Sequence, residues 1–412
     1  MKSSLLSRPV RLAVFLEQEM KLGGGFQQSL NAALETTHLS KELCEPIFIT
    51  TVKKNIPILL QYGINARLLR LPIGRKTFLW IRSRLQHKLL LTIIRRLFGL
   101  NYLDSFLSEQ LVDLVYFTTP SVLALYTEKY NYIFTVWDLC HRDEVEFPEV
   151  RQDREFERRE HLYRKVLPRG TAILADSELG RNNIVRRYGV DEERVHVMRF
   201  SASIVTRNHE TIDGRRSVDV KSKYELQDDY VYYPAQFWPH KNHIYLIQGL
   251  VELEQKFGRK LAAVFSGSDM GNMDYVKSVA VESGIADRIR YVGFVPNSEI
   301  PELYKQSVAL VMPTYFGPTN LPPLEAFHLK VPVLYSNLPG LAEQVGDAAL
   351  LMDLSNPGSM ALHLNDLLND QLLRSKLIEK GTERLNEVAS NKGLGLIEFI
   401  IDSYRTKRQS WG

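Results

Sequence analysis

The segment from Met312 to Ala361 constrains the fold of this chain more than any other part of the sequence. An apolar run at residues 308–312 ends in a turn-rich loop, residues 315–323, and a short helical pattern and a second apolar run, residues 331–335, follow. A strand, a loop, a helix and a strand form the repeating unit of a parallel α/β sheet. The loop opens a helix N-terminus, where backbone N–H groups and the helix dipole favour an anion. Glu325 lies inside that helix and can reach hydroxyl groups of the molecule that carries the anion; a sugar nucleotide carries both.

Length and composition indicate a globular protein with more than one core. A chain of 412 residues predicts two domains of roughly 200 residues each. The hydrophobic share of 44% and the charged share of 24% are ordinary for such proteins. The net charge of +4 is too small to indicate a nucleic-acid partner.

Short apolar runs alternate with longer helical patterns along most of the chain, which predicts doubly wound parallel sheets. In the first half the predicted strands are residues 11–16, 46–51, 66–71, 111–117, 132–136 and 172–175. A polar stretch without apolar periodicity interrupts this rhythm, and a second α/β series begins at Tyr230. We therefore expect a first domain over 1–205, a linker or surface excursion over 206–229, a second domain over 230–392 and a terminal helix over 393–412.

A second informative segment, YYPAQFWPHKNH, follows the first strand of the second half and places Lys241 where a helix starts. A lysine beside the N–H groups of a helix start suits a diphosphate. A lysine at a helix start is also often merely solvated, so the flanking motif carries this interpretation.

The segments PTYFGPTNLPPLEAFHLKVPVLYS and NLPGLAEQVGDAAL together resemble the donor-binding region of the family 4 glycosyltransferases, also described as glycosyl transferases group 1. The resemblance extends with lower density over nearly the whole chain. It implies a retaining, metal-independent transferase of GT-B architecture, in which two Rossmann-like domains face a central cleft. The N-terminal domain would bind the acceptor and the C-terminal domain the nucleotide-sugar donor.

Carried over to this sequence, the resemblance assigns Glu325 to the ribose hydroxyls of the donor and the helix starting near Leu321 to its diphosphate. The family usually has two glutamates flanking this loop; Glu325 matches the second, and Gly317 stands where the first would be. The contact of that glutamate with the donor sugar would come from the backbone of Thr319 and Asn320, or be absent.

Other donor-binding positions follow from the same resemblance. Gln236 replaces the arginine that usually precedes Lys241 by five residues, so stabilisation of the leaving group would depend more on Lys241, with His240 as a helper. The loops SGS and GFVP, with Gly267, Phe294 and Val295 among their residues, resemble those that hold the nucleoside.

The first half contributes two further candidate segments. Gly24 and Gly25 belong to a glycine triplet after the first strand, which permits a close approach of backbone to phosphate or sugar; such loops are often simple turns. The segment FTVWDLCH ends a buried strand and contains Asp138 and His141, which we expect in the active site. Trp137 in the same segment is predicted either to stack on a sugar or to pack in the core.

No cofactor or metal is expected. No D-x-D motif occurs, and the ten histidines form no pair with ligand spacing. The resemblance implies that the departing diphosphate itself takes the acceptor proton, with Lys241, Glu325, Asp138 and His141 as the catalytic set.

The acceptor is expected to be a glycan or a lipid-linked sugar, in the synthesis of a bacterial-type surface polysaccharide such as lipopolysaccharide, capsule or exopolysaccharide. Two alternatives stay open: a nucleotide-sugar epimerase on the same fold, and a catalytically silent sugar-nucleotide-binding subunit. Product analysis with donor alone distinguishes the epimerase from the transferase, because an epimerase needs no acceptor. Donor binding without turnover across acceptors would favour the silent subunit.

The cysteine pattern and the predicted helix at residues 75–97 indicate where in the cell the protein acts. Cys44 and Cys140 lack disulfide or metal spacing, and no signal peptide or membrane-spanning run is visible, so a cytoplasmic setting is expected. The segment from Arg75 to Leu97 mixes basic and bulky apolar residues. We expect it either to touch an anionic membrane peripherally, on the inner face of the cell membrane, or to pack as an ordinary helix with a basic side.

Overall fold

The computed structural model describes residues 8–19, 23–72, 74, 101–201, 219–226, 229–317, 319–390 and 393–411. The chain forms two compact units, one of residues 1–137, 157–199 and 392–412 and the other of residues 138–156 and 200–391. The basic helix expected at residues 75–97 lies outside the described residues, as does most of the predicted linker. Within the described ranges, no helix is both long and apolar enough to cross a bilayer.

The first unit is built on a seven-stranded sheet in which every pairing is parallel. Its strand order is β3-β2-β1-β4-β5-β6-β7. The strands are β1 (Val10–Leu16), β2 (Cys44–Thr50), β3 (Arg67–Leu68), β4 (Leu114–Phe117), β5 (Asn131–Val136), β6 (Ala172–Ala175) and β7 (Val195–Val197). The sequence pattern missed β7, because three residues are too few to show a period.

The second unit repeats this plan with a six-stranded parallel sheet, ordered β10-β9-β8-β11-β12-β13. The strands are β8 (Tyr230–Pro234), β9 (Ala262–Ser266), β10 (Ile289–Gly293), β11 (Leu310–Met312), β12 (Val333–Ser336) and β13 (Leu350–Met352). Both sheets therefore have doubly wound topology, and the predicted fold class is confirmed.

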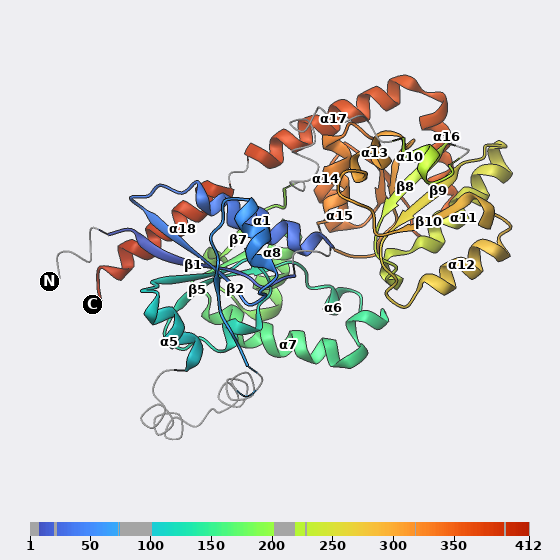
Figure 1. Ribbon diagram of the computed structural model, residues 1–412. Helices are drawn as coiled ribbons and strands as arrows, with labels where there is room; N and C mark the ends of the chain where they lie inside the picture. Colours follow the sequence, from blue (N-terminus) through green and yellow to red (C-terminus); the bar gives the residue numbers. More distant parts are fainter. Residues whose placement is uncertain are drawn as a thin grey trace. The chain divides into compact units, whose positions relative to one another are not determined.

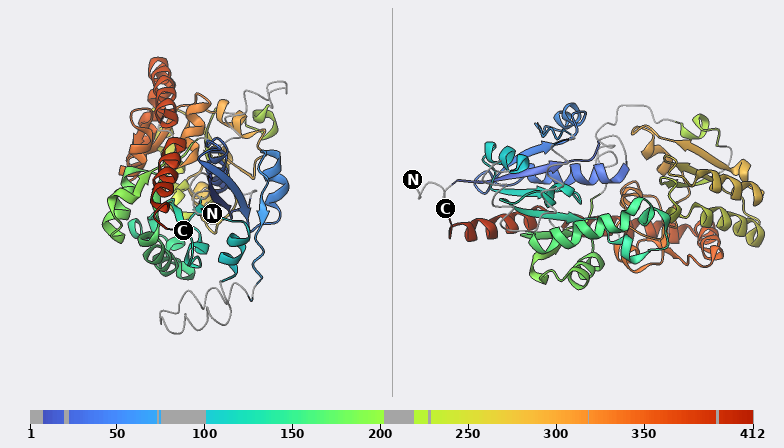
Figure 2. Two further views of the ribbon diagram at one scale, coloured as in Figure 1. Left: turned by 90° about the vertical axis from the view of Figure 1, so that its left-hand side faces the viewer. Right: turned by 90° about the horizontal axis from the view of Figure 1, so that it is seen from below.

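Helices cover the two sheets, and the strands lie layered between them (Figures 1 and 2). Those of the first sheet include α1 (Gly23–Thr37), α2 (Asn55–Gln61), α5 (Tyr102–Glu109), α7 (Glu155–Val166) and α8 (Glu178–Tyr188). Those of the second unit include α6 (Cys140–Asp143), α10 (Val220–Lys223), α11 (His243–Phe257), α12 (Met273–Glu282), α13 (Ile300–Lys305), α14 (Leu321–His328), α15 (Pro339–Val345), α16 (Pro357–Asn369) and α17 (Gln371–Ser390).

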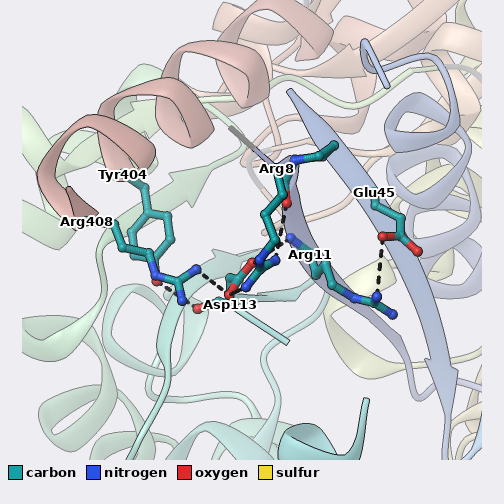
Figure 3. A network of polar contacts seen from close by, with 7 residues as sticks. Arg8, Arg11, Glu45, Asp113, Tyr404 and Arg408 are labelled. Atoms are coloured by element: carbon teal, nitrogen blue, oxygen red, sulfur yellow. Dashed lines mark hydrogen bonds and ion pairs between the residues drawn. The ribbon is translucent and has the colours of Figure 1, made fainter. Parts of the chain in front are cut away.

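The last helix, α18 (Gly393–Arg408), belongs to the first unit although it follows α17 of the second. Asp113, whose side chain is 2% exposed, anchors it (Figure 3). Arg408 of α18 pairs with Asp113 from one side, and Arg8 forms two hydrogen bonds with it from the other, at 2.6 and 2.8 Å. Tyr404 donates to the Asp113 carbonyl at 2.8 Å. One buried carboxylate thus joins the start of β1 to the C-terminal helix.

We expect Asp113→Asn to lower the unfolding free energy of the first unit by about 2 kcal/mol, because two arginines lose their carboxylate. This loss of stability is smaller than that for a fully buried ion pair, because water reaches the guanidinium groups of Arg8 and Arg408, whose side chains are 33% and 32% exposed. Urea unfolding measures it. The control is Glu45→Gln, which breaks the 3.5 Å pair with Arg11 in the same network and should change stability by under about 0.5 kcal/mol. Equal effects of the two variants would contradict the anchoring role.

Candidate functional site

Strands β8 and β11 lie side by side at the centre of the second sheet, and the chain winds outward from them in opposite directions. Ligands of open α/β sheets bind beyond the carboxyl ends of the strands at such a reversal. Two loops leave this point, residues 235–242 after β8 and residues 313–320 after β11. They carry Gln236 and Lys241 on one side and Thr319 and Asn320 on the other.

Lys241 ends a short 3-10 turn, Pro239–Lys241, and directly precedes Asn242, the N-cap of α11. Its Nζ donates to Oδ1 of Asn320 at 3.2 Å, so the structure brings together two predicted donor-binding residues from the two loops. Burial lowers the pKa of Lys241 from 10.5 to about 8, although the nearby Cys140, Asp138 and Glu149 act to raise it. The lysine is therefore a largely desolvated cation at neutral pH.

Asn320 is held rigidly in place for this contact. Its Nδ2 donates to the Gly317 carbonyl at 2.8 Å and to the Tyr335 hydroxyl at 2.6 Å, which orients Oδ1 toward Lys241. Gln344 binds the Asn320 backbone twice, accepting from its N–H at 3.0 Å and donating to its carbonyl at 2.6 Å. The loop over α14 is thus preorganised by α15 and β12, an arrangement that favours electrostatic stabilisation of a bound group.

The N-terminus of α14 offers fewer backbone N–H donors to a bound anion than expected from the sequence. Of the four N–H positions that open a helix, Pro322 and Pro323 have none, and the Asn320 N–H is bonded to Gln344. The Leu321 N–H is the remaining one. An anion at this end would therefore interact with one backbone donor, the helix dipole and Lys241, which gives the lysine more weight.

Glu325 lies in the second turn of α14 and is half-buried. The hydroxyl of Tyr304, a fully buried residue of α13, donates to its Oε2 at 2.9 Å. This bond fixes the orientation of the carboxylate.

The sequence missed Glu149, which the structure places against His240. Its Oε1 accepts from the His240 backbone N–H at 3.0 Å and from ring nitrogen Nδ1 at 2.5 Å. Burial alone would raise the pKa of Glu149, but the hydrogen bonds from His240 outweigh it and lower the pKa. Residues 138–156 belong to the second unit, which makes this contact across 91 residues possible. No local pattern signals it.

His240 is buried, and its ring stacks on Phe316 with centroids 3.8 Å apart. Burial lowers its pKa to about 4, with the Lys241 charge acting in the same direction and the Glu149 hydrogen bond opposing it. The imidazole is therefore neutral at pH 7. It positions the loop that precedes Lys241 and brings no positive charge to a leaving group.

The other two residues of the expected catalytic set lie near α6. Asp138 accepts from the Cys140 N–H at 3.1 Å, and its charge acts on Lys241. His141 is fully buried, and its ring packs edge-on against Phe156 with centroids 5.5 Å apart. Asp138 thus shares the electrostatic environment of Lys241, whereas His141 lies in a packed interior.

The remaining donor-binding candidates of the second unit line the ends of β8 to β10. Gln236 is half-buried, and its Oε1 accepts from the Trp238 indole N–H at 3.1 Å, which leaves its amide N–H₂ as a donor. Gly267 approaches the β8 loop so closely that a Cβ would lie 2.3 Å from the Ala235 carbonyl oxygen. Phe294 is exposed, whereas Val295 belongs to the core.

In the first unit, the glycine triplet forms the first turn of α1 and not a preceding loop. A Cβ on Gly25 would lie 2.7 Å from the indole of Trp137, so this glycine makes room for the tryptophan ring. Gly25 and Trp137 thus pack together within the first unit. Over the described ranges, no group of three or more His, Cys, Asp or Glu side chains is arranged to hold a metal ion.

Two doubly wound sheets, with a lysine–asparagine pair at the reversal point of the second, define an α/β protein of two Rossmann-like units. The comparisons narrow this class. Residues 215–384 match the family model described as glycosyl transferases group 1. The second unit thus contains a glycosyl transferases group 1 domain, and the chain has the GT-B fold.

Among curated proteins, O-antigen chain mannosyltransferase B of Escherichia coli is 29% identical over 211 residues, 51% of this chain and 54% of that protein. D-inositol 3-phosphate glycosyltransferase of Corynebacterium efficiens is 27% identical over 222 residues, 52% of this chain and 51% of that protein. The chain thus spans about half the length of these relatives. Among solved structures, Anabaena HepE in complex with UDP-glucose matches with a TM-score of 0.64 and 14% identity, covering 96% of this chain and 99% of that one.

Proposed function

We propose that the protein is a retaining glycosyltransferase that moves a hexose from a nucleotide-sugar donor to a glycan or lipid-linked acceptor, in the synthesis of a surface polysaccharide. The observation that carries the proposal is the Lys241–Asn320 pair at the reversal point of the second sheet, with Glu325 one turn further along α14. Lys241 and the α14 dipole suit a diphosphate, and Glu325 suits the ribose hydroxyls. The similarity to an O-antigen mannosyltransferase and to a fold that binds UDP-glucose supports the substrate class.

In the proposed mechanism, the acceptor oxygen attacks the anomeric carbon on the face from which the diphosphate leaves. The bond from the anomeric carbon to the phosphate oxygen breaks, a glycosidic bond forms, and the acceptor hydroxyl proton moves to the departing phosphate. Lys241 stabilises the negative charge that develops on that phosphate, and Gln236 contributes a neutral donor through its amide nitrogen. Asp138 and Glu149 keep Lys241 protonated. The chemistry proposed for these residues needs no metal, and activity in EDTA tests that point.

Thermal shift with UDP-, GDP- and ADP-hexoses identifies the donor, because a ligand that binds the folded state raises the melting temperature. Product analysis then follows, with donor alone and with membrane glycolipid extracts as acceptor. We expect transfer to an extract component with retention at the anomeric carbon. Failure of every donor to bind would overturn the proposal.

Two alternatives make different predictions in the same assay. An epimerase on this fold would convert or release donor without an acceptor. A catalytically silent subunit would bind donor without turnover; the neutral Gln236 and the absence of a carboxylate at Gly317 favour it over the epimerase. We also propose a cytoplasmic location and a peripheral membrane contact through residues 75–97, and co-sedimentation with anionic vesicles at low and high salt tests the contact.

Donor affinity should depend on pH through Lys241. Because burial places its pKa at about 8, below the ordinary 10.5, the cation is present at pH 7 and is lost as pH rises through about 8. We expect the affinity for the UDP-hexose, whose doubly esterified diphosphate does not titrate in this range, to be nearly constant from pH 6 to 7.5 and to fall about tenfold per unit above pH 8.5. Calorimetric titration across pH 6–10 measures it, and Lys241→Arg should abolish the decline. A flat profile in the wild type would contradict the role of Lys241 as the phosphate cation.

A further inference from the structure

Gln344 is a buried polar residue of α15, and both ends of its side-chain amide are engaged. Its helix neighbours Leu341 and Val345 belong to the hydrophobic core of the second unit. Nε2 donates to the Asn320 carbonyl at 2.6 Å, while Oε1 accepts from the Asn320 N–H at 3.0 Å and from the Tyr335 hydroxyl at 3.1 Å. A flipped amide would place donor against donor and acceptor against acceptor, so these contacts permit one orientation of the side chain.

Arg384 of α17 fixes the end of α15 from which Gln344 extends. The helix ends at Val345, and the last carbonyl groups of a helix have no partner within it. Arg384 provides the donors: Nε donates to the Gln344 carbonyl at 3.0 Å and Nη2 to the Glu343 carbonyl at 2.5 Å. Its Nη1 donates to Glu387, one turn along α17, at 2.6 Å, which orients the guanidinium group. The position of Gln344 therefore depends on a residue 40 positions further along the chain.

These contacts continue to the lysine that is proposed to bind the diphosphate. Asn320, whose backbone Gln344 holds, accepts from Lys241 Nζ through its Oδ1 at 3.2 Å. An ammonium group has three N–H donors, so the one directed at Asn320 limits where the other two point. The Asn320 N–H lies at the start of α14, where it would suit an anion, but it is bonded to Gln344 instead. Holding Asn320 in place thus takes up one backbone donor of the anion site.

We propose that Gln344 and Arg384, hereafter the α15 clamp, are positioning residues that hold Asn320 and through it direct the Lys241 ammonium group toward the leaving diphosphate. This inference rests on the proposed function. A preorganised donor stabilises the charge that develops in the transition state without first having to reorient. The α15 clamp therefore contributes more to kcat than to donor binding, because a mobile lysine can still reach the diphosphate of a bound donor.

Gln344→Leu removes the three amide contacts but keeps a side chain of similar size that suits the apolar surroundings. We expect kcat with the donor identified by thermal shift to fall about 10- to 100-fold, and KM for the donor to change less than about threefold. The matched control is Gln306→Leu. Gln306 directly follows α13, and its amide donates to Glu302 of that helix at 3.3 Å. This control should leave both constants within about twofold of the wild type.

A second pair of variants tests the Arg384 contacts by the same kinetic measurements. Arg384→Met removes the bonds to the Glu343 and Gln344 carbonyls, and kcat should fall about 5- to 20-fold. The control is Arg374→Met in the same helix, where the guanidinium group donates to the Val308 carbonyl at 2.8 Å. Each substitution takes an arginine from a backbone carbonyl, so both should lower stability in urea to a similar extent. We expect a lower kcat in Arg384→Met alone, with partial recovery in Arg384→Lys, which restores the charge but not the planar pair of donors.

The pH profile of donor affinity provides a readout that a purely structural role would not change. Loss of the Asn320 oxygen as an acceptor disfavours the protonated amine. In Gln344→Leu the decline in UDP-hexose affinity should therefore begin about 0.5 to 1 pH unit lower than in the wild type. The carboxylates of Asp138 and Glu149 and the Cys140 side chain, which also act on the lysine, are unchanged in this variant. Calorimetric titration measures the shift and applies even to a protein that binds donor without turnover.

A folded Gln344→Leu protein with the wild-type kcat and an unshifted pH profile overturns this inference and leaves the proposed function intact. Equal losses of kcat in Arg384→Met and Arg374→Met also overturn it, because the effect would then follow stability. A wild-type protein that binds none of the donors overturns the proposed function, and this inference with it. If Gln344→Leu does not fold, Tyr335→Phe replaces it. This variant removes the hydroxyl that accepts from Asn320 and donates to Gln344, so kcat and the pH profile should change in the same directions.

Discussion

Lys241→Ala should reduce turnover about 100- to 1,000-fold while the protein stays folded. The lysine is a half-buried cation at the reversal point of the second sheet, and its neighbour Asn320 is held by Gly317, Tyr335 and Gln344. Removing one preorganised donor to a developing negative charge has an effect of this size. Steady-state kinetics with the donor identified by thermal shift measure it.

The control for this substitution is Lys256→Ala. Lys256 lies in the last turn of α11, its side chain is 56% exposed, and it pairs with Glu252. It should leave turnover within about twofold of the wild type, because an exposed i,i+4 pair contributes little. A folded Lys241→Ala protein with near-normal turnover would show that Lys241 does not contact the leaving group.

Glu325→Gln should weaken donor binding about 10- to 100-fold with little effect on stability. A carboxylate that accepts two ribose hydroxyls forms charge-assisted bonds worth roughly 1.5–3 kcal/mol, and the amide loses most of that. Tyr304 can still donate to the remaining oxygen, which preserves the packing of α13 on α14. Calorimetric titration with the donor measures the affinity, and thermal unfolding measures stability.

Glu282→Gln, at the exposed end of α12, is the control for a neutralised surface carboxylate and should change neither quantity. If Glu325→Gln lowered the melting temperature strongly and left donor affinity unchanged, Glu325 would be a structural partner of Tyr304 and not a ribose ligand. Tyr304→Phe separates the two roles further, because it should weaken donor binding less than Glu325→Gln does.

Much of the fold was predictable from local pattern alone. Apolar runs of the β8 and β11 type, each followed by a turn-rich loop and a helical pattern, require parallel strands, because a helix must return the chain to the same edge of the sheet. That geometry brings the loop ends together, which is why Lys241 and Asn320 meet across 79 residues. The sequence also contained Pro322 and Pro323, whose missing N–H groups reduce the anion site of α14.

Contacts that depend on the path of connecting segments could not be read from the sequence. Glu149 reaches His240 because residues 138–156 pack with the second unit although they follow a strand of the first, and no period or motif encodes that choice. Tyr404 reaches the Asp113 carbonyl across 291 residues for the same reason. Local periodicity and turn chemistry specify the two sheets and the loops that carry Lys241, Asn320 and Glu325, so these features could be predicted before the structure was known. The stacking of buried His240 on Phe316 and the packing of Gly25 against Trp137 become visible only in the folded protein, because both contacts join segments that are far apart in the sequence.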